Sequence, residues 1–534
     1  MKNIQKITSK YSWGIWLFAF IWLILVSLDY INKHPAYFSS VEYFQYTKLY
    51  IFLAALIALI AFMYTSDKWP LARPPINGLS ILAYMLIVSI ACIVAHKNYS
   101  FSPTDTADLF HFFANAWILC AIVFFMLIAF YAFGDFIHRI CLKSMINSNP
   151  VMNLALGIMA YCLVLFLLAS IGMFQQAFLI LVLVIFAGIN YKAVFSVLKK
   201  IFLNPWKRDK LSVLGIVSFC ILVYLFVLQF LANIAPYPAG FDSLNYYMNI
   251  SQMVAKNQSL VEGYQPYYWS LFMATGYSIL GRAELALELS FVGIVLVVIA
   301  AYRLAVYRLG LDKNLSLFCL LLFAIAPAQV NQMYTELKVD FAMLFFQILV
   351  LEYVLILVKR LNKDKEDKNN TIRKMVFMAI FIGLLSSFAL GIKMLNMFMV
   401  FTVLVLFWWN GKDKAGIVGI LCFSLLLFIV SGTDELSGLD KYHLSRDVVK
   451  IVLVVMMLVA FGMSFVKHKS LFIKRVVVSA VFGFSTVILI LPWMAKNFSE
   501  TKSLNPRTLL MGKSPGPGLN MSKIIKNYEK TKDQ

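Results

Sequence analysis

Apolar runs long enough to cross a lipid bilayer recur along the whole chain and restrict it to one class of fold. A helix needs about 20 apolar residues to cross the hydrocarbon core, where every backbone polar group must be hydrogen-bonded within the protein. About fifteen such runs occur, near residues 12–29, 49–64, 78–96, 115–134, 151–172, 175–191, 211–233, 285–302, 314–331, 337–358, 375–391, 394–409, 415–430, 448–466 and 475–493. Hydrophobic residues make up 61% of the 534 residues and charged residues only 14%. The sequence therefore predicts an all-α polytopic membrane protein with about 15 transmembrane helices.

The basic residues predict the orientation of these helices. With the N-terminus inside, the cytoplasmic segments collect 29 of the 47 Lys and Arg residues, and the outer loops before the C-terminal tail hold 10. Because Lys and Arg accumulate on the cytoplasmic side, this bias favours a cytoplasmic N-terminus and an outer tail. The net charge of +21 then reflects membrane topology and does not indicate nucleic-acid binding. The first apolar run is long and lacks a small-residue cleavage site, so no cleavable signal peptide is expected.

The composition divides the chain into three parts. Residues 1–200 supply six predicted helices to which no role is assigned, and the basic segment 199–210 is the natural boundary. From residue 201 to 493 the predicted outer loops become rich in carboxylates and tyrosines. Residues 494–534 carry the Ser-Pro-Gly-Pro-Gly segment at 514–518, which would break a helix, so we expect a disordered or unfinished tail.

Cysteine and histidine patterns indicate neither a disulfide framework nor a structural metal site. The seven cysteines lie in or beside apolar runs without a CxxC pair, and the six histidines are far apart in the sequence. No cofactor is required by these patterns.

The most informative segment is the polar, aromatic stretch at 240–247, which reads Gly-Phe-Asp-Ser-Leu-Asn-Tyr-Tyr. It follows the apolar run 211–233 and opens the longest loop that the charge pattern places outside, so Asp242 is predicted to lie about ten residues beyond a membrane helix. The loop continues through an aromatic stretch at 264–269 into an apolar segment at 271–280. That segment is too short to span comfortably, which favours an interfacial or re-entrant helix.

Three later segments deliver polar residues to the same predicted face. Glu336 and Asp340 lie in the outer turn at 334–340, and their spacing of four places them on one face if the turn is helical. Lys393 interrupts the outer hairpin between two apolar runs, and Pro-Trp-Met-Ala-Lys-Asn at 492–497 ends the last predicted helix. We therefore expect Asp242 and Asp340 at one membrane level, within about 10 Å, the scale of a shared small-ligand pocket.

These segments resemble motifs of the GT-C fold membrane glycosyltransferases, in particular the bacterial branch similar to dolichyl-phosphate-mannose protein mannosyltransferases and aminoarabinose transferases. The 240–247 stretch is similar to the family's G-W-D-x-L-x-Y-H loop, with Phe for Trp and Tyr247 for His. Asp340 matches the later outer-turn Asp. Residues 383–393 are similar to a G-x-x-x-G-x-x-x-x-T-K hairpin with Ile392 for Thr, and 492–497 to Pro-Trp-x-x-Arg-Asn with Lys496 for Arg.

The resemblance covers residues 211–500, a little over half the chain, and leaves the first six helices unassigned. It implies a GT-C-like catalytic core in a bacterial cell membrane, with the active site on the extracytoplasmic face. Members of this family carry further residues after the Pro-Trp segment, so the resemblance implies that the chain is truncated at Gln534.

The resemblance further implies an inverting glycosyltransferase of the cell envelope. Such an enzyme passes a sugar from a polyprenyl phosphate in the membrane lipid to a glycan, lipid or protein acceptor. Asp242 would be the general base, because the acceptor hydroxyl must lose a proton as it attacks. Lys393, with Arg282 as a second candidate, would stabilise the phosphate. Glu336 and Asp340 would bind sugar hydroxyls or a divalent cation. The sugar or the lipid headgroup would contact four aromatic residues: Tyr246, Tyr247, Tyr267 and Tyr268.

Structural explanations for the same residues stay open. Asp242 suits a turn or a helix cap, Lys393 can snorkel to the interface, and the tyrosines suit an interfacial belt. A transporter or flippase of lipid-linked saccharides, or a polymerase, is the alternative function. A transporter favours ionisable residues inside helices, and Glu352, within an apolar run, is the main example.

Overall fold

The computed structural model describes residues 106–142, 148–204, 211–233, 246–326, 339–361, 368–409, 413–430 and 446–512, with the single positions 82, 86 and 329. All regular elements in these residues are helices, which agrees with the predicted all-α class. Six of the described helices are long and apolar enough to cross a membrane, or seven if one pair bent by 81° forms a single span. The total of about 15 spans stays a prediction, and the first three runs lie outside the described residues apart from positions 82 and 86.

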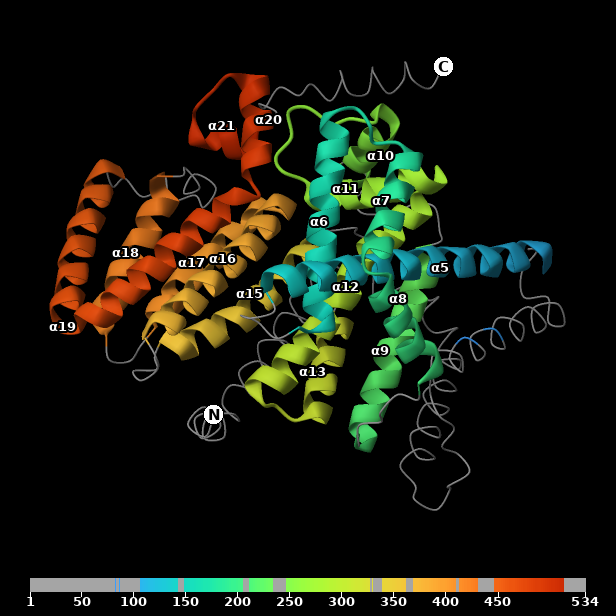
Figure 1. The fold of residues 1–534 in the computed structure, drawn as a ribbon, viewed down its shortest axis with the longest axis horizontal. Helices are drawn as coiled ribbons and strands as arrows, with labels where there is room; N and C mark the ends of the chain where they lie inside the picture. Colours follow the sequence, from blue (N-terminus) through green and yellow to red (C-terminus); the bar gives the residue numbers. More distant parts are fainter. Residues whose placement is uncertain are drawn as a thin grey trace, which may run out of the picture.

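The described part of the chain consists of a succession of helices (Figure 1). Their bounds are α5 Thr106–Ile137, η3 His138–Leu142, α6 Pro150–Ser170, α7 Gln176–Ile189, α8 Tyr191–Leu198, η4 Lys199–Leu203, α9 Val213–Ala232, α10 Met248–Asn257, α11 Tyr268–Leu280, α12 Ala283–Arg303, η6 Leu304–Leu309, α13 Lys313–Ile325, α15 Asp340–Leu361, α16 Lys368–Ile392, η7 Met394–Asn396, α17 Met397–Trp408, α18 Lys414–Val430, α19 Arg446–Ile488, α20 Leu491–Thr501 and α21 Pro506–Met511. Each predicted apolar run from residue 115 onward coincides with one of these helices.

Local sequence signals explain where several helices begin and bend. The Asn149 side chain caps α6 by accepting a hydrogen bond from the Met152 amide at 2.8 Å, and Asp312 caps α13 in the same way. The last two predicted runs form the two limbs of α19, which bends at His468, where the backbone leaves the helical region (φ −138°, ψ 42°). Figure 1 shows the two limbs of α19 diverging from this bend.

One hydrophobic core joins helices from both sides of the predicted boundary at residue 200. The ring of Phe130 in α5 lies 5.7 Å from that of Phe272 in α11, and the Tyr161 hydroxyl donates to the Thr275 hydroxyl at 3.5 Å. In Figure 1, α5 runs across α6. Gly157 permits this close crossing, because a Cβ atom there would collide with the Phe130 backbone. The described helices before residue 200 are thus packed into the same core as those that follow it.

Glu352 is buried in α15, but two arginines neutralise it. Its carboxylate accepts a hydrogen bond from Arg308 Nε at 2.7 Å and from Arg303 Nη2 at 3.2 Å. The carboxylate side chain is 1% exposed, whereas those of Arg303 and Arg308 are 21% and 32% exposed. A buried charge is tolerated when it is paired and hydrogen-bonded. The one acidic residue that sequence analysis singled out inside an apolar run therefore has a structural role in this fold.

The beginning of the predicted tail is ordered into helices. Residues 494–501 belong to α20, and α21 follows at Pro506–Met511. Glu500 accepts a hydrogen bond from the Gly263 amide at 3.0 Å, and the Asn497 side chain donates to the Leu509 carbonyl at 2.9 Å. The expectation of disorder from residue 494 is thus wrong for 494–512, because these tertiary contacts hold the segment. Residues 513–534 lie outside the described residues.

Replacing Glu352 with Gln tests the structural role of the cluster. The amide keeps the shape but leaves two arginines without their anion, and hydrogen bonds to charged groups contribute about 1.5–3 kcal/mol each. Because both arginines can reach solvent, we expect a loss of about 1–3 kcal/mol of stability. Thermal unfolding in detergent measures the loss.

The matched control is Glu284→Gln. Glu284 lies 3.8 Å from the exposed Arg282 guanidinium, and exposed pairs contribute about 0–1 kcal/mol. Equal melting temperatures for the two variants would contradict a structural role for the Glu352 cluster.

Candidate functional site

Lys393 and Asp340, two predicted site residues 53 positions apart, form an ion pair. The Lys393 ammonium donates to Asp340 Oδ1 at 2.8 Å and to Oδ2 at 3.0 Å. Asp340 is the first residue of α15, where the helix N-terminus favours a carboxylate, and Lys393 immediately follows α16. Both side chains are about a quarter exposed (27% and 26%), so the pair is accessible from outside the core.

Asn396 fixes the turn that carries Lys393. Its side chain is fully buried, donates to the Ser386 carbonyl at 3.0 Å and accepts from the Gln347 amide at 3.0 Å. These bonds tie the turn after α16 to the body of α15 and to α16 itself. Sequence analysis did not single out Asn396. The available signal was an amide within an otherwise apolar stretch, which usually requires a hydrogen-bond partner when buried.

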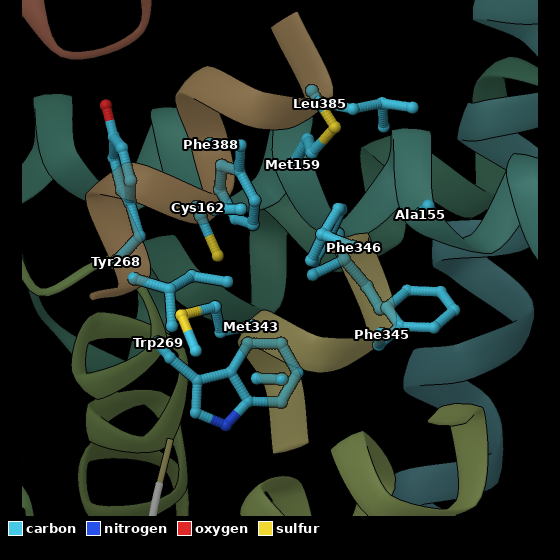
Figure 2. Packing of buried hydrophobic residues seen from close by; sticks show 14 of the residues in the cluster. Ala155, Met159, Cys162, Tyr268, Trp269, Met343, Phe345, Phe346, Leu385 and Phe388 are labelled. Carbon is cyan, nitrogen blue, oxygen red and sulfur yellow. The ribbon is translucent and has the colours of Figure 1, made fainter. Parts of the chain in front are cut away.

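The Tyr268 ring joins α11 to the end of α16, two residues before Lys393. It stacks on Phe388 with ring centroids 5.1 Å apart, and it fills the space beside Gly391, where a Cβ atom would collide with the ring. Figure 2 shows Tyr268 and Phe388 in the same buried cluster. The Tyr268 hydroxyl donates to the Leu489 carbonyl at 2.7 Å, just before α20.

Trp493 brings the start of α20 to the same place. Its fully buried ring lies 4.5 Å from the Tyr267 ring and 5.3 Å from the Tyr268 ring, and it also contacts Phe166 at 4.7 Å. We call this region the junction: the starts of α11, α15 and α20, together with the end of α16 and its turn through Asn396. It unites residues that the charge pattern assigns to one membrane face.

Tyr246 contacts the residues that directly precede α11, and through them it adjoins the junction; Tyr247 contacts Tyr246. Gln265 donates to the Tyr246 hydroxyl at 3.0 Å, and the Tyr246 and Tyr247 rings meet edge to face at 5.0 Å. Burial raises the pKa of Tyr246 to about 12, and burial likewise raises the pKa of Tyr267. Both phenols are therefore protonated at neutral pH, so they can donate hydrogen bonds but cannot serve as general bases.

Tyr267 and Tyr268 act as packing residues in this structure. Tyr267 is 2% exposed and its hydroxyl accepts from the Val261 amide at 2.7 Å, while Tyr268 is fully buried. A ring that binds sugar needs an accessible face, and these two rings are covered by protein. The predicted contact with sugar or headgroup is better served by Tyr246, at the edge of the cluster.

Three predicted site residues remain: Asp242, Glu336 and Arg282. Asp242 and Glu336 lie outside the described residues, so their distances to Asp340 stay a prediction. Arg282 directly precedes α12, at the far end of α11 from Tyr268, and its guanidinium donates to the Asn115 side chain at 3.5 Å. The structure therefore gives Arg282 partners other than the Lys393–Asp340 pair.

The described part of the chain contains no preformed cluster of side chains that could bind a divalent cation. Groups of three or more His, Cys, Asp or Glu side chains are absent there. Asp340, the described candidate ligand, has both carboxylate oxygens bonded to Lys393. A cation at this position would have to displace the ammonium.

An apolar groove is lined by residues that flank Lys393 in the sequence, whereas Lys393 and Asp340 are not among its lining residues. It has a volume of about 510 Å³ and lies between α17, α18 and the second limb of α19. Residues 397, 400, 401, 404 and 408 line it from α17, a spacing that places them on one helix face. Leu390 and Met394, on either side of Lys393, line its junction end, and Trp408 lines the other. Thr486 is a polar residue in the lining, but its hydroxyl donates to the Phe482 carbonyl within α19. Its hydrogen-bonding capacity is therefore met within the helix.

Glu288 is an acidic residue that sequence analysis missed. It is 1% exposed in α12, and neither carboxylate oxygen has a hydrogen-bond partner in the described part of the chain. Asn233 is its polar neighbour, and the Gln229 side chain donates to Asn233 at 2.8 Å. In the sequence, Asn233 lies shortly before the stretch at 240–247 that carries Asp242. The signal in the sequence was a lone carboxylate one turn inside an apolar run.

Gly391→Ala tests the junction. The added methyl group must displace the Tyr268 ring or the end of α16, and overpacking of this kind costs about 1–3 kcal/mol. We therefore expect a lower melting temperature in detergent. Gly462→Ala, at a position with open space in α19, is the control and should leave stability unchanged or slightly improved. A neutral Gly391→Ala variant would show that the Tyr268 contact does not hold the junction.

Comparison with known proteins leaves the site to be interpreted from its own geometry. The chain matches no protein-family model, no curated protein and no solved structure. The resemblance to GT-C glycosyltransferases therefore stays a prediction, based on the order of the motifs at 240–247, 340, 383–393 and 492–497.

Proposed function

We propose that the protein is a membrane glycosyltransferase that takes a sugar from a polyprenyl-phosphate carrier and passes it to an acceptor at the extracytoplasmic face. The observation that carries this proposal is that Lys393, which is paired with Asp340, lies in the chain between Leu390 and Met394, two residues that line an apolar groove. A charged pair and a long apolar slot are the two features that a phosphate lipid requires of a binding site.

The groove suits the hydrocarbon part of such a carrier. It follows α17 from Met397 to Trp408, which corresponds to about 16 Å of helix. Its volume of about 510 Å³ falls within the range of roughly 300–1,000 Å³ that is typical of small-molecule pockets. The carrier chain would lie along α17, and its phosphate would emerge beside Lys393.

Lys393 can bind a phosphate without losing Asp340. An ammonium group has three N–H donors, and two of them point to the Asp340 oxygens in this structure. The third can bond a phosphate oxygen. Asp340 then has a positioning role, because it holds the ammonium in place.

The proposed reaction assigns the proton to Asp242. The acceptor hydroxyl oxygen attacks the anomeric carbon of the sugar while its proton passes to the Asp242 carboxylate. The bond between the anomeric carbon and the phosphate oxygen breaks, and the carrier leaves as a polyprenyl phosphate. The negative charge that develops on the leaving phosphate is stabilised by Lys393, most strongly in a site with little water.

Transport of a lipid-linked saccharide is the second candidate, and Glu288 is the observation that favours it. Its carboxylate is buried beside Asn233 and makes no hydrogen bond within the described residues. Ionisable residues buried inside membrane helices are typical of ion and substrate pathways. Glu352 no longer supports transport, since Arg303 and Arg308 neutralise it.

Asp242→Asn separates the catalytic role from binding. The amide keeps the size of the side chain but cannot accept the proton, so turnover should fall by about 10²–10⁴ while donor binding is retained. Lys393→Met should weaken donor binding as well as turnover, because the phosphate charge is present before the reaction. Transfer of labelled sugar and binding of labelled carrier measure the two effects.

Lys199→Met, at an exposed lysine of η4 away from the junction, is the matched control and should behave like the wild type. Near-normal turnover in a monodisperse Asp242→Asn protein would remove Asp242 as the base.

A second experiment separates transferase from transporter. Purified protein in detergent, supplied with glycosylated carrier and acceptor, should release free polyprenyl phosphate. A transporter would leave the carrier chemically intact and move it between leaflets in liposomes. Intact carrier with a broad panel of acceptors, together with measurable flipping that Glu288→Gln abolishes, would favour the transporter.

A further inference from the structure

A second cavity lies at the opposite end of α17 from the junction. It has a volume of about 640 Å³ and is formed by the start of α18 and the part of α19 that leads to the bend at His468. The sequence segments 410–414 and 467–475, which contribute residues to this cavity, are those that the Lys/Arg bias assigns to the cytoplasmic side. The cavity therefore belongs to the inner membrane surface. It is distinct from the proposed catalytic groove, although Val418 and Ala460 of the cavity are close in the chain to Ile420 and Phe461 of the groove.

The floor of this cavity is a buried ion pair. Arg475 Nη1 donates to Asp413 Oδ2 at 3.1 Å, and both side chains are at most 1% exposed. The Ser464 hydroxyl also donates to Asp413 Oδ2, at 2.8 Å, while the Gly416 amide donates to Oδ1 at 2.9 Å. The negative charge of Asp413, the acidic residue that lines the cavity, is thus already neutralised by Arg475 beneath it.

The rim of the cavity is basic. Lys414 and Lys467 are exposed, and His468, at the bend of α19, is half-buried. With Asp413 neutralised, two lysines leave a net positive charge at the mouth of the cavity. This charge is complementary to an anion that approaches from the membrane surface.

One wall of the cavity is apolar and open to the surroundings. It consists of residues of the first limb of α19 that are about half exposed: Val455 (54%), Met456 (47%), Val459 (59%) and Met463 (48%). In a helix of a membrane protein such residues contact lipid chains. The cavity thus combines an apolar slot with a basic rim, which are the two parts of an acidic phospholipid.

We propose that this cavity binds one acidic phospholipid of the cytoplasmic leaflet. The phosphate would lie between Lys414 and Lys467, and an acyl chain would follow the wall formed by Val455 and Val459. Anionic lipids enrich the cytoplasmic leaflet and attract basic side chains at its surface. The bound lipid would brace α18 against α19, and so support the helices that form the catalytic groove from below.

The test compares two lipids with identical acyl chains, phosphatidylglycerol and phosphatidylcholine, on the full-length protein. Native mass spectrometry counts bound lipid, and thermal unfolding reports the stabilisation. The wild type should prefer phosphatidylglycerol. Since one basic side chain near an anionic surface contributes about a five-fold gain in binding, Lys414→Gln with Lys467→Gln should lower the preference about 25-fold, and Lys467→Gln alone about five-fold.

Two further variants make the result specific. Lys199→Gln with Lys200→Gln removes two exposed basic residues of η4 and should leave the lipid preference unchanged. Val459→Trp fills the apolar slot and should weaken both lipids, because both carry the same acyl chains. Melting temperatures in phosphatidylcholine show that each variant is folded.

Two outcomes would overturn the proposal. A phosphatidylglycerol preference that survives the Lys414→Gln and Lys467→Gln double variant would mean that the lipid binds elsewhere. Stabilisation by inorganic phosphate equal to that by phosphatidylglycerol would mean that the rim binds a free anion without a lipid chain. Failure of the sugar-transfer assay would affect neither result, since the inference is independent of the proposed catalysis.

Discussion

The contact between the Tyr268 ring and the bare backbone of Gly391 is the constraint on which the junction depends. It lets α11 approach the end of α16, where the ring stacks on Phe388 and its hydroxyl reaches the Leu489 carbonyl. Trp493 then packs on the same ring and brings in the start of α20. Because Lys393 follows Gly391 by two residues, the same contact positions the ammonium that pairs with Asp340.

The distribution of buried charge follows the physics of an apolar interior. Glu352 is paired with two arginines, and Asp413 with Arg475, so each of these buried carboxylates is neutralised and hydrogen-bonded. Glu288 departs from this rule in the described part of the chain, since its oxygens have no hydrogen-bond partner. Such departures concentrate at sites where a protein binds or moves something. The position of Glu288 beside Asn233, a residue that lies shortly before Asp242 in the sequence, makes it a residue to include in any test of function.

Sequence patterns predicted the described helices well, whereas the functional site stays a prediction. Runs of apolar residues marked every described helix of spanning length, and the charge bias grouped the segments that meet at the junction. The pairing of Lys393 with Asp340 was not predictable, because both were expected to face a ligand and a sequence contains no information on which charges face each other. The sequence also did not predict that the rings of Tyr267 and Tyr268 are buried, because an aromatic stretch is compatible with the protein core and with the membrane interface alike.

The sequence by itself determined that this chain is a helical membrane protein, because the length and frequency of its apolar runs leave no other way to satisfy the backbone in lipid. It also determined which segments carry polar groups between those runs. Only the tertiary structure decided which of these groups touch, that residues 494–501 continue as a helix, and that an apolar groove forms between α17, α18 and α19. Those features depend on packing between helices far apart in the chain, where single contacts such as that of Tyr268 with Gly391 select one arrangement among many with the same pattern.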